Sequence, residues 1–233
     1  TFRMRKLTAT LCLTIAVLLG SVGIDTKVLA DSSIGTLRID NEVYSLPFPE
    51  GFCDVTEDLF GIQTLSALKN LSSKNAAIGK PLLIFRLCDA DQDKTFPWGF
   101  VSTFPKNRLL NNQVSFNKFR RRFLMDKGFV KKFLKKSGDK NKNVLSDYGT
   151  DIKNMEFGKP KIFWEDNNVS IIVLVSKMEV NGSPYNELSI YASTVFKERV
   201  IQIATFDEVG NHLNGKAYTL DLAKAAARFK KMN

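Results

Sequence analysis

Histidine and cysteine are scarce in this chain of 233 residues, which contains one histidine, His212, and three cysteines. A single imidazole excludes a zinc site built from two or three histidines. Three cysteines exclude a four-cysteine zinc or iron–sulfur site and a scaffold held together by many disulfides. The sequence also lacks a G-x-S-x-G nucleophile elbow, a phosphate-binding loop and a dinucleotide fingerprint. It therefore predicts no metal and no cofactor, and it identifies no small-molecule ligand.

Long apolar runs are missing except near the N-terminus. A short basic segment begins at Met4, residues 7–24 carry no charge, and residues 28–30 (VLA) resemble a cleavage site. This order is typical of a secretory signal peptide. An uncleaved membrane anchor is the alternative, but the run is short for a span of about 20 residues. We predict a signal peptide at 1–30 and an exported, periplasmic or extracellular, domain at 31–233.

Two of the cysteines, Cys53 and Cys88, follow the predicted leader. An exported chain meets an oxidising compartment, where two thiols tend to pair. A bridge closing a loop of about 35 residues would contribute a few kcal/mol to stability. We therefore predict a Cys53–Cys88 disulfide, and two buried reduced cysteines are the alternative.

Turn residues and alternating apolar positions predict most of the β-structure. Residues 36–46 alternate around Asp40-Asn41, which predicts a hairpin. Residues 161–206 predict three or four antiparallel strands in meander order, with tight turns at Asn181-Gly182 and Lys197-Glu198. Two further strands are predicted at 81–87 and 100–104.

Two helices are predicted outside the most basic part of the chain. The first begins at a cap, Asp54 or Thr56, and runs to about residue 71 with an apolar stripe. Its stripe consists of Leu59, Ile62, Leu65 (or Ser66) and Leu68. The second covers about 219–232 with Leu222, Ala226 and Phe229 on one face. Helices and hairpins without a regular βαβ order predict an α+β fold, a single domain with an antiparallel sheet and helices packed on its faces.

Residues 46–53 read LPFPEGFC and resemble the LP-x-PEG-aromatic-Cys segment near the mature start of a family of small bacterial exported proteins. The order of elements is also similar to the α/β/α sandwich of PsbP-like proteins. The resemblance implies export and this kind of fold, and it brings no catalytic residues with it.

Positive charge is concentrated in one segment, residues 116–142. Eleven basic residues stand there against two acidic ones, a net +9, within a chain whose formal charge is +10. Removal of the leader, with four basic residues and one acid, leaves +7, so the remainder of the exported domain is slightly acidic. The candidate contacts for an anionic partner are Lys118, Arg120, Arg121, Arg122, Lys127, Lys131, Lys132, Lys135 and Lys136.

The same segment is amphipathic. Its phenylalanines lie at helical spacing on either side of Gly128, which is the expected point of a break or kink. They are Phe116, Phe119, Phe123, Phe129 and Phe133. A helix is predicted over 116–136, followed by a polar, lysine-rich loop over 137–149.

Four interpretations of this basic helix stay open. Its phenylalanines enter the core and its lysines face water; it lies on an anionic membrane surface; it contacts an acidic protein or nucleic acid; or it is a localisation address. No RNA-binding motif accompanies the charge. We predict a non-enzymatic binding protein that uses this face, with a hydrolase built on carboxylates or a structural envelope component as alternatives.

Two weaker candidates for chemistry are present. Asp89, Asp91 and Asp93 open like a calcium loop, but Lys94 stands at the sixth position, where a turn glycine is expected. This stretch is predicted to be a solvated acidic turn. His212 could pair with a cysteine as base and nucleophile, but it stands among polar residues and the disulfide would consume the thiol. Neither is retained as a site.

Overall fold

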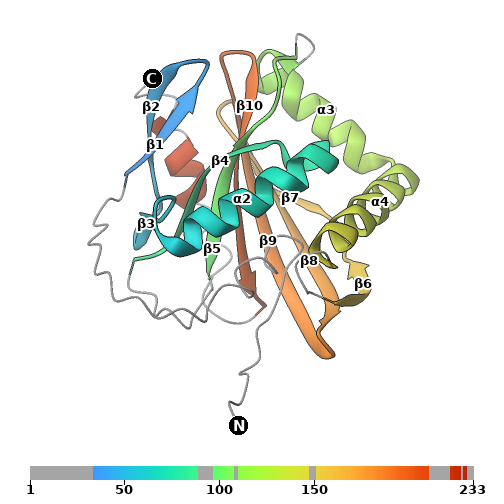
Figure 1. The fold of residues 1–233 in the computed structure, drawn as a ribbon. Coiled ribbons are helices and arrows are strands. Elements are labelled where there is room, and N and C mark those ends of the chain that lie inside the picture. The colour runs from blue at the N-terminus through green and yellow to red at the C-terminus, as the bar shows by residue number, and fades with distance from the viewer. Residues whose placement is uncertain are drawn as a thin grey trace.

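The computed structural model describes residues 34–88, 97–107, 110–146, 151–209, 221–226 and 228–229. The predicted signal peptide, the acidic turn at 89–93 and His212 lie outside these residues. The fold is α+β, as predicted, and an antiparallel sheet forms its centre (Figure 1).

Eight strands form the main sheet, in the order β3-β4-β5-β10-β9-β8-β6, and β7 pairs with β8 beside β6. Both β6 and β7 use the same edge of β8, because β7 pairs with its residues 170–173 and β6 with residues 176–180. The strand bounds are β3 Phe52–Asp54, β4 Lys80–Leu87, β5 Trp98–Thr103, β6 Ile152–Phe157, β7 Lys161–Glu165, β8 Ser170–Val180, β9 Ser183–Phe196 and β10 Arg199–Glu208.

The predicted hairpins are confirmed, and each has a two-residue turn. Strands β1 (Ile34–Ile39) and β2 (Glu42–Pro47) form a separate two-stranded sheet. Both turn residues have positive φ at Asp40-Asn41 (50° and 68°), Asn181-Gly182 (48° and 80°) and Lys197-Glu198 (46° and 62°). Two successive positive φ values match the right-handed twist of the flanking strands. These turns set the register of β1–β2 and of the β8–β9–β10 meander.

The two faces of the main sheet are covered by different elements. The β1–β2 hairpin and the C-terminal helical segment, 221–226 and 228–229, pack on one face, where Leu37, Phe85 and Ile190 share a buried core with Leu222, Ala226 and Phe229. The other face is covered by α2 (Leu59–Lys74), α3 (Gln113–Met125) and α4 (Lys127–Ser146), as Figure 1 shows. A short 3-10 helix, η1 (Ala76–Ile78), follows α2.

Helix α2 begins later than predicted and buries a different face. Its cap is Asp58, whose Oδ1 accepts a hydrogen bond from the amide of Gly61 at 2.6 Å. The predicted stripe is wrong at Leu59 and Ile62, which are 50% and 55% exposed. A Cβ at Gly61 would lie 1.7 Å from the carbonyl oxygen of Val55, so the helix approaches its neighbours too closely for large side chains. The buried positions are Gly61, Thr64, Ala67, Leu68 and Leu71.

The basic segment is helical, as predicted, and forms two helices. The break lies two residues before the predicted point at Gly128, and the loop predicted over 137–149 is wrong at 137–146. The break falls at Asp126, which ends α3 and whose Oδ1 accepts a hydrogen bond from the amide of Phe129 at 2.9 Å. The residues predicted as a loop from 137 continue α4 to Ser146. This extension buries Gly138, Val144 and Leu145. The side-chain amide of Asn75 donates a hydrogen bond to Oδ1 of Asn141 at 2.9 Å. Residues 147–149 lie outside the described part.

The predicted disulfide is present. Antiparallel pairing of β3 with β4 brings Cys53 next to Cys88, whose sulfur atoms are 1.99 Å apart and whose Cα atoms are 5.0 Å apart. The amide of Cys88 donates to the carbonyl of Gly51 at 2.8 Å, which closes the turn before β3. Every helix within the described ranges is too short or too polar to cross a bilayer.

Candidate docking surface and cavity

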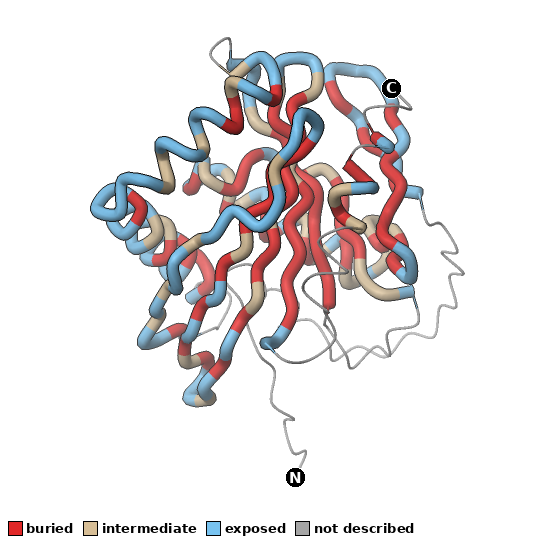
Figure 2. Tube along the Cα trace, turned by 180° about the vertical axis from the view of Figure 1, so that it is seen from behind, coloured by how far each residue is buried: buried red, intermediate tan, exposed pale blue. Residues whose placement is uncertain are grey.

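Four of the five phenylalanines of the basic segment gather at the α3–α4 corner, where three are exposed and Phe123 is half-buried. Phe116 alone enters the core, at 7% exposure. The other four, here called the aromatic cluster, contact one another with ring centroids 5.3 to 6.4 Å apart. They are Phe119, Phe123, Phe129 and Phe133. Figure 2 shows this corner as a largely exposed projection beyond the sheet.

Most of the predicted basic contacts surround this cluster with their charges uncompensated. Within the residues that the structure describes, Arg121 is the one member with an ion pair, and Arg120 instead donates a hydrogen bond to the sheet. The other seven make no ion pair within these residues. All seven are exposed: Lys118, Arg122, Lys127, Lys131, Lys132, Lys135 and Lys136.

The two remaining arginines hold α3 on the sheet. The Nη1 of Arg120 donates to the carbonyl of Ser170 at 3.0 Å, and its guanidinium lies 5.1 Å from the ring centroid of Phe116. Burial lowers the pKa of Arg120 to about 10, although nearby Glu165 opposes the shift. Arg121 forms an ion pair with Glu165. Both cations therefore have partners within the protein, although the side chain of Arg121 stays 66% exposed.

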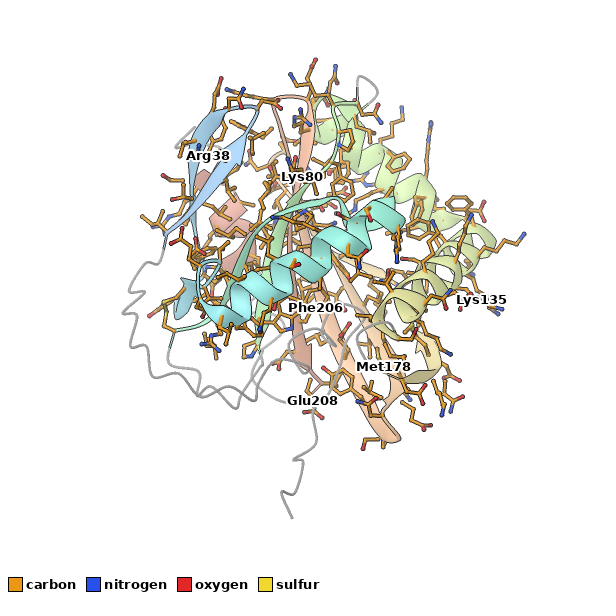
Figure 3. All side chains as sticks on the ribbon, in the orientation of Figure 1. Arg38, Lys80, Lys135, Met178, Phe206 and Glu208 are labelled. Carbon is orange, nitrogen blue, oxygen red and sulfur yellow. A yellow bond between two sulfur atoms is a disulfide. The ribbon has the colours of Figure 1, made fainter. Side chains whose placement is uncertain are left out.

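An outer cavity of about 620 Å³ lies between α4 and β6. Its walls are apolar, with Val130, Leu134 and Met155 among them, and its rim carries lysines from α4 and from the turn after β6. Lys135 is one of these, and Figure 3 shows it on the side of α4 that faces away from the centre of the molecule. The rim lysines are Lys127, Lys131, Lys135, Lys142 and Lys159, against Asp139 and Glu156.

An inner cavity of about 190 Å³ lies under the α3–α4 corner, against the sheet. Phe100, Ile172 and Phe206 are among its apolar walls, whereas β8, β9 and β10 contribute a polar stripe. That stripe consists of Ser176, Glu187, Ser189 and Gln202. Leu124, Val130, Leu134, Phe157 and Pro160 line both cavities, so the two adjoin across an apolar layer.

Glu187 is the most unusual group in the inner cavity. Its residue is 1% exposed, and Oε1 accepts a hydrogen bond from the hydroxyl of Ser189 at 2.5 Å. The other oxygen, Oε2, is buried and has no partner in the structure. Burial raises the pKa of Glu187 to about 8, and the Ser189 hydrogen bond only partly opposes the shift. The carboxyl group is therefore mainly protonated at neutral pH and can donate a hydrogen bond.

The sequence analysis missed Glu187. Along β9, polar residues at 187, 189 and 193 alternate with apolar residues such as Leu188 and Ile190. This pattern is typical of a strand with one face in water. Helices cover that face in the folded protein, so the polar stripe is buried. The available signal was the length of β9, because a long strand is typical of the centre of a sheet. A central strand with helices on both faces is expected to be apolar on both, so a polar residue in it stands out.

The carboxyl groups that line the two cavities bear on the alternative of a hydrolase based on two carboxylates. Glu187 is the one carboxyl group among the described residues of the inner cavity, and Asp139 and Glu156 of the outer cavity lie among lysines. No protein-family model matches this chain, and no curated protein matches it either. The resemblance of residues 46–53 to small bacterial exported proteins therefore stays a prediction.

Proposed function

We propose that this chain is an exported, non-enzymatic binding protein that docks on an anionic lipid surface through the α3–α4 corner. The observation that carries the proposal is the aromatic cluster, largely exposed amid lysines whose charges have no partner within the described residues. At the same corner Met125 is 80% exposed. Large apolar side chains that stay in water on a folded domain are typical of interaction sites.

A lipid surface matches both components of this corner. Phenylalanines that insert at the level of the headgroups gain from burial, and each lysine near anionic lipid contributes about 1 kcal/mol. Nucleic acid and an acidic protein would use the cations but would not require four contacting phenylalanine rings at the corner. These two partners become the contrary outcomes of the experiment below.

The export part of the proposal rests on two observations. The N-terminal sequence has the order of a signal peptide. The Cys53–Cys88 bridge suits an oxidising compartment outside the cytosol. A periplasmic or extracellular location follows for the proposed protein, where it would meet the outer surface of a membrane.

Sedimentation with lipid vesicles tests the docking proposal. The protein should bind vesicles that contain about a third phosphatidylglycerol, bind neutral phosphatidylcholine weakly, and dissociate as salt rises. Replacement of Phe119 and Phe129 by Ser should weaken binding about tenfold or more, because two exposed rings can no longer insert. The matched control replaces Leu59 and Ile62 of α2 in the same way. These residues are equally exposed but lie outside the α3–α4 corner, so the control should bind vesicles like the wild type.

A charge variant completes the design. Replacing Lys131, Lys132, Lys135 and Lys136 by Gln should abolish the preference for anionic vesicles, whereas Lys69→Gln with Lys80→Gln should change little. If the phenylalanine variant bound vesicles as tightly as the wild type, insertion of the rings into the lipid surface would be contradicted. Tighter binding to DNA or polyglutamate than to vesicles, insensitive to the phenylalanine changes, would replace the lipid surface by an anionic polymer as the partner.

A further inference from the structure

One atom of the buried polar stripe under the α3–α4 corner has no hydrogen-bond partner among the described residues, and it is Oε2 of Glu187. Native proteins pair nearly all their buried polar side chains, because an unpaired group costs about 1 to 3 kcal/mol. Glu187 Oε2 is an exception, and it belongs to a residue that lines a cavity. A carboxyl group kept in such a place calls for a partner that the described part of the chain does not supply.

The cavity has the composition of a ligand site. Its walls are mainly apolar, and a few polar groups gather on one side, from Ser176 on β8, Glu187 and Ser189 on β9 and Gln202 on β10. Register pairing places Ser176 directly beside Glu187, so the polar groups are fixed on rigid strands. A mainly apolar pocket with few, well-placed polar groups is the usual form of a small-molecule site. Its volume of about 190 Å³ corresponds to roughly six water molecules, enough for a short alkyl chain.

The inner cavity is connected to the surface by the aromatic cluster. Phe123 and Phe133 line the cavity, and their rings also contact one another at 5.3 Å at the exposed corner. The outer cavity continues the apolar wall on the other side of Val130 and Leu134. The shared side chains separate the two cavities, so a ligand of the inner cavity is limited to about the length that this cavity holds.

We infer that the inner cavity binds a neutral, single-chain amphiphile whose hydroxyl or carbonyl oxygen accepts a hydrogen bond from Glu187. The alkyl chain lies against Phe100, Ile172 and Phe206. An uncharged ligand is favoured because an ion would lose part of its hydration shell against the mainly apolar walls. This site goes beyond the proposed docking function, since its occupation does not require a membrane.

Three probes with the same chain and different ends test the inference: 1-octanol, octanoate and octylammonium. Isothermal titration calorimetry in vesicle-free buffer at pH 7 should show one 1-octanol per protein and at least about tenfold weaker binding of both ions. Tightest binding of octylammonium would overturn the inference, because Glu187 would then act as an ionised counterion. Tightest binding of octanoate would overturn it in favour of Arg120, and absence of 1-octanol binding would overturn it outright.

Two variants test the role of Glu187 itself. Glu187→Leu should bind 1-octanol about tenfold more weakly, because one hydrogen bond is lost. Glu187→Gln keeps a donor and should bind nearly as the wild type does. Equal affinity of the wild type and Glu187→Leu would overturn the hydrogen bond. Both variants remove a buried carboxyl group, and circular dichroism shows whether they fold.

The affinity of the wild type for 2-octanone, which has an acceptor oxygen and no donor, should fall about tenfold between pH 7 and pH 9.5, because ionised Glu187 has no proton to donate. Arg120 from α3 and Tyr191 from β9 are the other titratable groups in this cavity, whereas α4, β8 and β10 present Asn141, Ser176 and Gln202. Glu187→Gln should lack this pH dependence. If the variant retained it, another group would be responsible and the assignment to Glu187 would be wrong.

Discussion

The two faces of the main sheet differ in how completely they are packed. Toward the β1–β2 hairpin and the C-terminal helical segment, Leu37, Phe85 and Phe229 are fully buried in a large apolar core. Toward the helices, α2 covers a comparable apolar core around Trp98, but the α3–α4 side holds two cavities and a polar stripe with Glu187. Stability is therefore expected to come mainly from the first face and from α2, and binding from the incompletely packed part.

The largest expected loss of stability comes from a substitution in the well-packed face. Phe85 is fully buried and contacts the rings of Phe48 and Phe52 at 5.2 and 5.7 Å between centroids. Phe85→Ala should lower the free energy of unfolding by about 3 to 5 kcal/mol, through lost burial and the cavity left behind. Phe133→Ala, at the exposed corner, should cost about 1 kcal/mol or less. Urea denaturation measures both, and similar costs would contradict the comparison.

The disulfide has a slightly smaller expected effect. It joins residues 35 apart in sequence, at the β3–β4 edge and away from the α3–α4 corner. Replacing Cys53 and Cys88 together by Ala should lower the free energy of unfolding by about 3 to 4 kcal/mol, because the unfolded chain gains freedom. Binding of 1-octanol and of anionic vesicles should stay as in the wild type at a temperature where the variant is folded. Loss of either would show that the two ends of the sheet are coupled.

The smallest expected effect sharpens the comparison on the cavity side. The pKa of Glu187 in the folded protein, about 8, lies above its ordinary value of 4.5. The unfolded chain releases this proton first as pH rises, so the group lowers stability progressively between pH 4.5 and 8 and has no such effect below that window. Between pH 5 and pH 8, the wild type should therefore lose about 1 to 3 kcal/mol relative to Glu187→Gln. Parallel urea denaturation at both pH values measures this difference, and equal changes would mean that the carboxyl group is not desolvated.

Local turn chemistry made the β-structure predictable. Asn181-Gly182 and Asp40-Asn41 accept positive φ with little strain, so the hairpins follow from two residues each. The disulfide was predictable from the cysteine count and the export signal, although only strand pairing brings the two cysteines together.

The helices were harder to predict because their limits depend on tertiary contacts. Nothing local marks Gly61 as the point where α2 approaches the backbone of Val55, so the large apolar residues seemed to form the buried stripe. Asp126 is a good helix cap, but glycine has the lower helix propensity. The sequence therefore predicted the break at Gly128 and not at Asp126. The cavity could not be predicted, because a strand with one polar face has the same sequence pattern whether that face meets solvent or is covered by a helix.

The two-residue turns of the β8–β9–β10 meander carry a consequence for the order of folding. They join neighbours in sequence, so the long β8–β9 and β9–β10 pairings need only small loops to close. We expect this ribbon to form early in the folding transition state, with α3 and α4 docking onto it late. Late docking means that the two helices can lift away transiently while the ribbon persists, which would let a guest molecule enter without global denaturation. Amide hydrogen exchange should accordingly be faster in α4 than in β9.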